Sequence, residues 1–86
     1  MISRTAEYAL RAVTHMAGRE MQEGVTSQTV GEIATGTRVP LGYLSKVLQQ
    51  LTKAGIIVSQ RGSGGGFRLA RTPAQISIYE IVHAVD

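Results

Sequence analysis

Two short apolar stripes, separated by a glycine and a proline, constrain the fold of this chain most strongly. The first stripe has apolar residues at helical spacing over 30–34. We expect Gly36 to supply the left-handed residue needed for a tight exit from this helix. Pro40 then forces Val39 out of the helical region, and a second stripe begins. Two short helices joined by a tight turn predict a helix-turn-helix over about 28–54.

Both helices have residues suited to their ends. Ser27 can cap the first helix, because its hydroxyl can accept a hydrogen bond from an early backbone N–H group. The second helix is expected to close at Ala54, with Lys53 in its last turn and Gly55 just past its end. Its buried stripe consists of Leu44, Val47, Leu48 and Leu51.

Further apolar residues at helical spacing precede this motif. They predict an N-terminal helix over roughly 3–18, with one buried face. Ser3 is a suitable N-cap for this helix, and either Gly18 or Gly24 ends the run.

The segment after Gly55 changes to an extended pattern. Residues 56–60 are β-branched and polar, while Phe67 and Leu69 alternate with Arg68, which indicates a half-buried strand. The glycine-rich stretch RGSGGGF, residues 61–67, lies between these two strands. We therefore predict a β-hairpin, or wing, over about 56–71.

A last helix over about 78–86 completes the predicted architecture. Ser77 stands three residues before Glu80, the spacing of a capping box, and apolar residues follow on one face. The fold class is mainly α with a small β-hairpin, a winged helix-turn-helix. We expect residues 1–86 to form a single domain of this kind.

The glycine-rich loop raises the alternative of a nucleotide site. A dinucleotide fingerprint needs a third glycine at position 67 and a helix after the loop, but this chain has Phe67 and a predicted strand. A P-loop needs Lys-Ser or Lys-Thr after its glycines, which this chain lacks. The absence of both motifs argues against nucleotide binding. A tip without side chains at Gly62, Gly64 and Gly65 can instead lie close to another surface. Arg61 can then reach a minor groove, whose negative floor attracts a guanidinium. The glycines could also merely permit positive φ in a long turn.

Charge placement favours an anionic partner. The net charge is +3, and no Asp or Glu occurs between Arg38 and Arg71. A solvated basic face without a partner is the alternative interpretation. With a winged helix, however, double-stranded DNA is the expected ligand, read by the second helix in the major groove and by the wing.

The second helix offers candidate contacts near its N-terminus. Ser45 and Lys46 can hydrogen-bond bases or phosphates, and Gln49 can pair with adenine. Tyr43 can donate its hydroxyl to a phosphate or pack at the helix start. Arg68 in the wing is a further candidate.

Other function classes find little support. The chain lacks cysteine, and its two histidines lie far apart in sequence, so we expect no metal site and no cofactor. We find no convincing catalytic constellation for a small enzyme and no small-molecule ligand. A protein-docking module using Leu41 and Tyr43 is the remaining alternative. No apolar run long enough for a membrane helix and no signal-peptide core occur, which predicts a cytoplasmic protein.

Several stretches of the chain resemble the Rrf2 family of bacterial winged-helix transcription regulators. They are YALRAV, EIA, VPLGYLSKVLQQLTKAGII, RGSGGGFRLAR and IVHAVD, and the match runs across essentially the whole chain. The resemblance implies a homodimer that binds an imperfect palindrome in promoters, usually as a repressor. It also implies that Arg61 enters the minor groove, and that Gly42, Ser45 and Lys46 face the major groove. Family members often have Glu-Gln in place of Ser45-Lys46 and proline in place of Ser63.

The C-terminal end departs from the family. Many members continue into a long dimerisation helix and a loop whose cysteines bind an iron–sulfur cluster that senses nitric oxide, iron or redox state. This chain stops at Asp86. We expect either a DNA-binding fragment of a longer protein or a regulator that works without a cluster.

Overall fold

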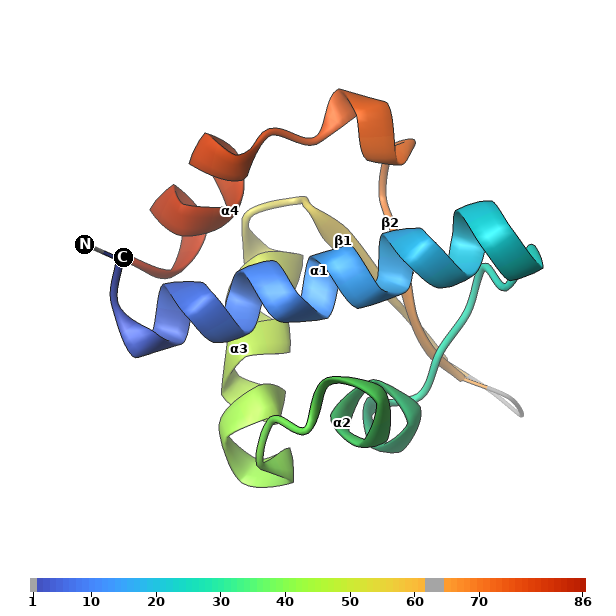
Figure 1. Ribbon diagram of the computed structural model, residues 1–86, viewed down its shortest axis with the longest axis horizontal. Helices are drawn as coiled ribbons and strands as arrows, with labels where there is room; N and C mark the ends of the chain where they lie inside the picture. Colours follow the sequence, from blue (N-terminus) through green and yellow to red (C-terminus); the bar gives the residue numbers. More distant parts are fainter. Residues whose placement is uncertain (1, 62–64) are drawn as a thin grey trace.

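The computed structural model describes residues 2–61 and 65–86 as four α-helices, a hairpin and a short 3-10 helix. In Figure 1, α1 crosses the molecule with α4 on one side and α2 and α3 on the other, and the two ends of the chain lie together. The order is α1 (Arg4–Glu23), α2 (Val30–Thr37), α3 (Leu41–Lys53), β1 (Ile57–Gln60), β2 (Gly66–Leu69), the 3-10 helix (Pro73–Gln75) and α4 (Ile78–Val85).

Helix α1 is longer than the sequence pattern predicted. It continues past Gly18 to Glu23, and Gly24 ends it in the left-handed region with φ of 69°. A glycine inside a helix costs only about 1 kcal/mol relative to alanine, so packing along the rest of the helix overrides it. The predicted N-cap is confirmed, because the Ser3 hydroxyl accepts a hydrogen bond from the Ala6 N–H at 3.0 Å.

The cap of α2 differs from the prediction. Thr29, not Ser27, caps this helix, and it forms a reciprocal capping box with Glu32. The Thr29 hydroxyl accepts from the Glu32 N–H at 3.1 Å, and the Glu32 carboxylate accepts from the Thr29 N–H at 2.8 Å. Two orphan N–H groups are satisfied in this way, whereas a lone serine cap satisfies one. Ser27 Oγ is buried and has no hydrogen-bond partner in the described part of the chain.

The turn of the helix-turn-helix also uses a different residue from the one expected. Arg38, not Gly36, adopts the left-handed conformation, with φ of 62°. Gly36 lies within α2, and a Cβ at this position would collide with the imidazole ring of His15 on α1. The glycine therefore allows close approach of the two helices rather than a change of chain direction.

The core joins α1 to the recognition motif. The predicted stripe of α3 is fully buried, and Gly55 follows the helix with φ of 79°, as expected. Buried alanines on α1 allow neighbouring elements to pack closely against it. The buried apolar side chains are those of Ala6, Ala9, Ala12, Val13, Met16, Ile33, Val39, Leu44, Val47, Leu48, Leu51, Ile56, Ile57, Leu69 and Ile81.

The hairpin is attached to the segment that precedes α2. Strands β1 and β2 are antiparallel, with Ile57 opposite Leu69. On the other edge of β2, Gln28 and Phe67 exchange two backbone hydrogen bonds of 2.9 and 2.7 Å. No local sequence pattern predicts this isolated β-bridge. This pairing holds strand β2 of the wing against the segment that precedes α2.

Helix α4 begins with the predicted capping box. The Ser77 hydroxyl accepts from the Glu80 N–H at 3.1 Å, and the Glu80 carboxylate accepts from the Ser77 N–H at 3.0 Å. Arg71, just after the wing, donates to the same carboxylate at 2.7 Å. The Arg71 guanidinium and the Ser77 backbone N–H hold the pKa of Glu80 at about 2, below its ordinary value of 4.5.

This pKa predicts an acid-sensitive contribution to stability. Because the carboxyl pKa is depressed in the folded chain, the stabilisation is fully present above pH 4.5 and is lost as the pH falls toward about 2. Thermal melts followed by circular dichroism should show Glu80→Gln less stable than the unmodified chain above this window, with the difference shrinking below it. Glu20→Gln is the control and should retain the pH dependence of the unmodified chain. A constant difference at every pH would contradict the assignment.

Candidate nucleic-acid interface

The outward side of α3 carries four of the predicted contact residues on one face. Ser45 and Lys46 lie three and four positions after Gly42, and Gln49 lies three positions after Lys46. The buried stripe lies on the other side of the helix. Lys46 and Gln49 are exposed, while Ser45 is half-buried and donates its hydroxyl to the Leu41 carbonyl at 3.1 Å. Lys46 and Gln49 are therefore the long hydrogen-bonding side chains of this face.

Tyr43 lies at the start of the same helix but is docked on α1. Its ring meets Tyr8 edge to face, with centroids 5.0 Å apart and an interplanar angle of 86°. Its hydroxyl forms a hydrogen bond of 2.6 Å with Thr5 Oγ1, yet the residue remains 40% exposed. The packing role left open by the sequence is present, and the hydroxyl still lies at the surface. Thr5 was not predicted, because no local pattern indicates a contact between such distant positions.

The predicted wing residues have different environments. Arg61 is exposed just after β1, and Gly65 is half-buried just before β2. Arg68 is half-buried on β2, and its guanidinium donates to the Leu69 carbonyl at 3.3 Å, which holds it against the strand. Gly62 and Gly64 lie outside the described residues.

The N-terminal end of α3 and the wing lie on the same side of the molecule. In Figure 1, the start of α3 and the far ends of β1 and β2 lie in the lower half of the view, away from α4. The segment 38–71, which contains α3 and the wing, has basic residues and no carboxylate. The carboxylates belong to other elements, at Glu7, Glu20, Glu23, Glu32, Glu80 and Asp86.

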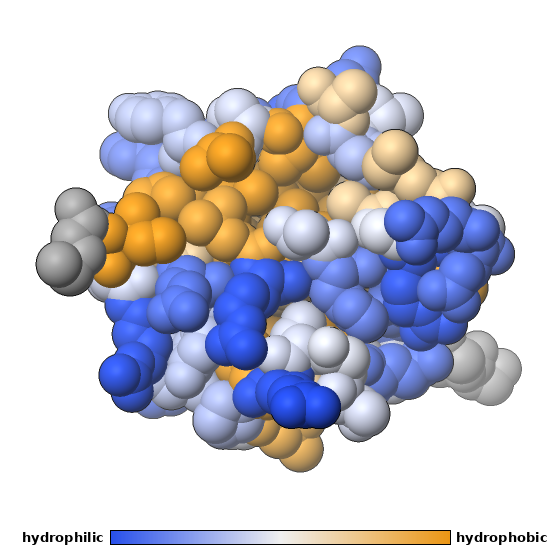
Figure 2. Space-filling model, viewed as in Figure 1, coloured by the Kyte–Doolittle hydropathy of each residue, from blue (hydrophilic) through white to orange (hydrophobic). Residues whose placement is uncertain are grey.

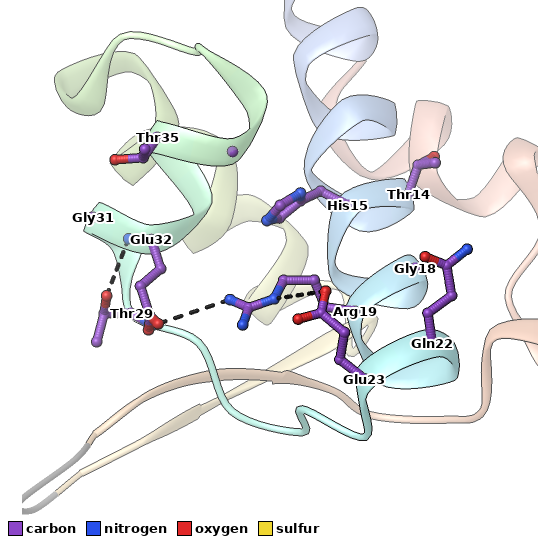
Figure 3. A pocket seen from close by; sticks show the side chains of 11 residues that line it. Thr14, His15, Gly18, Arg19, Gln22, Glu23, Thr29, Gly31, Glu32 and Thr35 are labelled. Carbon is purple, nitrogen blue, oxygen red and sulfur yellow. Dashed lines mark hydrogen bonds and ion pairs between the residues drawn. The ribbon is translucent and has the colours of Figure 1, made fainter.

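A hollow of about 830 Å³ lies between α1 and α2, and its electrostatic character differs from that of α3 and the wing. Arg19 lies between two carboxylates, 3.6 Å from Glu23 and 3.8 Å from Glu32 (Figure 3). The Thr29 backbone N–H, with its hydroxyl and the nearby Arg19, lowers the pKa of Glu32. The lowered pKa keeps the Glu32 carboxylate charged near neutral pH. The two carboxylates make this hollow unfavourable for a polyanion, whereas residues 38–71 contain no carboxylate.

The residues of this chain do not fit an iron–sulfur cluster. Such clusters are held mainly by cysteine thiolates, and none of the 86 residues is cysteine. Within residues 2–61 and 65–86, no group of three or more His, Asp or Glu side chains could hold a metal ion. No helix in these ranges is long and apolar enough to span a membrane.

A helix-turn-helix followed by a two-stranded hairpin and a terminal helix defines a winged helix-turn-helix protein. The chain belongs to the Rrf2 family, whose model, described as an iron-dependent transcriptional regulator, matches residues 2–86. Both the predicted fold class and the family resemblance are confirmed.

Known relatives are transcriptional regulators of the same type. An rrf2-like HTH-type transcriptional regulator of Rhodobacter capsulatus is 36% identical over 86 residues, which cover 100% of this chain and 57% of that protein. The HTH-type transcriptional regulator IscR of Aliivibrio salmonicida is 35% identical over 79 residues, or 92% of this chain and 45% of the relative. The chain therefore spans about half the length of these curated relatives.

Solved structures share the fold over the full chain. IscR of T. potens superimposes with a TM-score of 0.89 at 28% identity, covering 100% of this chain and 61% of that one. CymR, the global cysteine regulator of B. subtilis, gives a TM-score of 0.88 at 26% identity, covering 100% of this chain and 64% of that one.

Proposed function

We propose that this chain is the DNA-reading part of a transcription regulator that binds double-stranded DNA in a sequence-specific way. The observation that carries the proposal is the carboxylate-free, basic segment 38–71, which forms both α3 and the wing. The exposed face of α3 fits the major groove, where Lys46 and Gln49 can reach base edges. Arg61 is exposed at the wing and fits the adjacent minor groove.

We further propose a homodimer that binds a promoter palindrome and acts as a repressor in the cytoplasm. Two copies of one helix-turn-helix read two half-sites related by two-fold symmetry, so a dimer and a palindrome imply each other. A bound dimer hinders polymerase where the palindrome overlaps a promoter.

An apolar surface supports self-association. Apolar residues gather over α4 and around the groove between α4 and α1 (Figure 2), and contiguous patches of this kind mark interaction sites. Ile78 and Tyr79 on α4 are 70% and 74% exposed. The groove has a volume of about 420 Å³, and its apolar lining consists of Leu10, Val13, Ala17, Pro73, Ile76, Ile78 and Ile81.

We expect the substitution Ile78→Lys to separate the dimer without unfolding the chain. Ile78 is exposed, so a lysine there places a charge in the proposed contact but not in the core. Sedimentation equilibrium should give a dimer for the unmodified chain and a monomer for the variant. Far-UV circular dichroism should show the same helical content for both, and the melting temperature of the unmodified chain, but not of the variant, should rise with protein concentration. Met21→Lys, at an apolar residue of α1 that is 73% exposed, is the matched control and should remain dimeric. A dimeric Ile78→Lys variant would exclude this surface as the interface.

The proposed function is tested by selection of duplexes from a random library with the purified chain, as salt is raised. We expect an enriched palindrome with half-sites about one helical turn apart, and affinity that falls steeply with salt because bound phosphates release counterions. Retention without sequence enrichment would leave a chain that holds DNA but does not read it.

Docking on a protein through Leu41 and Tyr43 is the second candidate function. These two side chains are 53% and 40% exposed, near the start of α3. Apolar docking would be nearly indifferent to salt. No retention of any duplex in the selection would favour this alternative over DNA binding.

A further inference from the structure

We propose that Thr5 and Tyr43 act together as a hydroxyl pair that donates one hydrogen bond to a backbone phosphate of the bound duplex. The contact would extend the DNA interface from α3 onto the first turn of α1. The sequence patterns predict a DNA contact for Tyr43 but none for Thr5. This inference rests on the proposed function and adds a named contact to it.

The geometry of the pair leaves one hydrogen available. Thr5 Oγ1 and the Tyr43 hydroxyl oxygen lie 2.6 Å apart, so one hydroxyl donates to the other. Each hydroxyl has a single hydrogen, and therefore the accepting hydroxyl keeps its own hydrogen for an outside acceptor. Neither group has another hydrogen-bond partner within residues 2–61 and 65–86.

The surroundings of the pair suit an anionic acceptor. A hollow of about 600 Å³ opens beside it, and no carboxylate lines this hollow. Lys46 is the charged residue of the lining, and its ammonium can reach the same phosphate. Asp86, which follows the lining residue Val85, accepts a hydrogen bond of 2.7 Å from the Ser3 hydroxyl. The lining consists of Thr5, Tyr43, Lys46, Val47, Gln49, Gln50 and Val85.

Packing fixes the position of the donor. The Tyr43 ring stands edge-on to Tyr8, and the Arg11 guanidinium lies 5.6 Å from the centre of the Tyr8 ring. A donor that is already held in place loses little conformational entropy when it binds, which favours affinity.

The location of the pair favours a phosphate over a base as the acceptor. The base-reading face of α3 is formed by Gly42, Ser45, Lys46 and Gln49, whereas the pair joins the side of the helix start to α1. Elements beside a recognition helix contact the DNA backbone, which positions the protein but carries no sequence information. The pair should therefore contribute equally to binding of every duplex.

The test compares the unmodified chain with the double variant Thr5→Val, Tyr43→Phe. Both substitutions keep the side-chain shape and the Tyr8 contact but remove both hydroxyls. We expect binding to the selected duplex and to a scrambled duplex to weaken by the same factor, roughly 10- to 100-fold, the range for a hydrogen bond to a charged group. Thr5→Ser keeps a hydroxyl in the pair and should retain the affinity of the unmodified chain. Thr35→Val, the same change at an exposed threonine of α2 that lines the hollow around Arg19, should leave the affinity unchanged.

A methylphosphonate scan identifies the acceptor directly. Replacing each phosphate of the selected duplex in turn by a neutral methylphosphonate should reveal one position in each half-site where the double variant loses less affinity than the unmodified chain does. An unchanged affinity of the folded double variant would overturn the proposal, and so would a changed selected sequence, which indicates that the pair only orients α3. Failure of the unmodified chain to bind any duplex would instead refute the proposed function itself.

Discussion

Replacing Arg61 by alanine is expected to weaken binding of the selected duplex by roughly 10-fold or more, with a smaller effect on a scrambled duplex. Arg61 is exposed immediately after β1, at the end of this strand that is farther from the body of the domain. A guanidinium inserted into a narrow minor groove interacts with the most negative part of the duplex surface, and groove width depends on sequence. The loss should therefore fall mainly on specific binding. Equilibrium titration of both duplexes at several salt concentrations measures this loss of affinity.

Two variants separate the shape of this side chain from its charge. Arg61→Lys keeps the positive charge but loses the planar guanidinium. Compared with Arg61→Ala, it should therefore regain the salt dependence of the unmodified chain more fully than its preference for the selected duplex. Lys53→Ala removes the same charge at the far end of α3, where Lys53 complements the helix dipole. This substitution should weaken binding of both duplexes slightly and by the same factor. Equal losses for Arg61→Ala and Lys53→Ala would exclude a minor-groove role for the wing arginine.

Replacing Gly66 by alanine is expected to destabilise the fold by about 2 kcal/mol or more. A Cβ at Gly66 would clash with the Gln28 backbone carbonyl, with its carbon at 2.7 Å, and would lie 3.1 Å from the Thr29 nitrogen. Backbone atoms cannot rotate away as a side chain can. Relief of the clash would separate β2 from Gln28 and break the two hydrogen bonds between Gln28 and Phe67.

Gly18→Ala is the matched control for this substitution. Gly18 lies inside α1, and nothing lies within 4 Å of an added Cβ. Alanine there should stabilise the chain by about 1 kcal/mol, because it is the better helix former. Urea denaturation should thus move the two variants in opposite directions. A Gly66→Ala variant as stable as the unmodified chain would mean that β2 is not held against Gln28 as tightly as the contacts imply.

Local chemistry made much of the fold predictable. The capping box of Ser77 and Glu80, the left-handed Gly55 and the buried stripe of α3 each depend on residues a few positions apart. Sequence patterns predict such short-range features well. The extension of α1 past Gly18 follows instead from packing along the whole helix, which propensity alone does not contain.

The errors and omissions concern contacts between distant segments. Gly36 was expected to form the turn because of its backbone freedom, but it lies against His15, and Arg38 adopts the left-handed conformation. The pairing of Gln28 with Phe67 and the contact of Thr5 with Tyr43 have no local signature. The absence of carboxylates from residues 38–71 can be read directly from the sequence, because it concerns one continuous segment.

The pairing of Gln28 with Phe67 has a consequence for how the proposed complex would choose among duplexes. Backbone hydrogen bonds join the hairpin to the segment before α2. The distance between the recognition helix and the wing is therefore fixed. A protein with this fixed distance cannot adjust to a duplex whose adjacent grooves are too wide or too narrow. The duplex must deform instead. Base pairs that no side chain touches would then influence affinity through the stiffness of the intervening DNA.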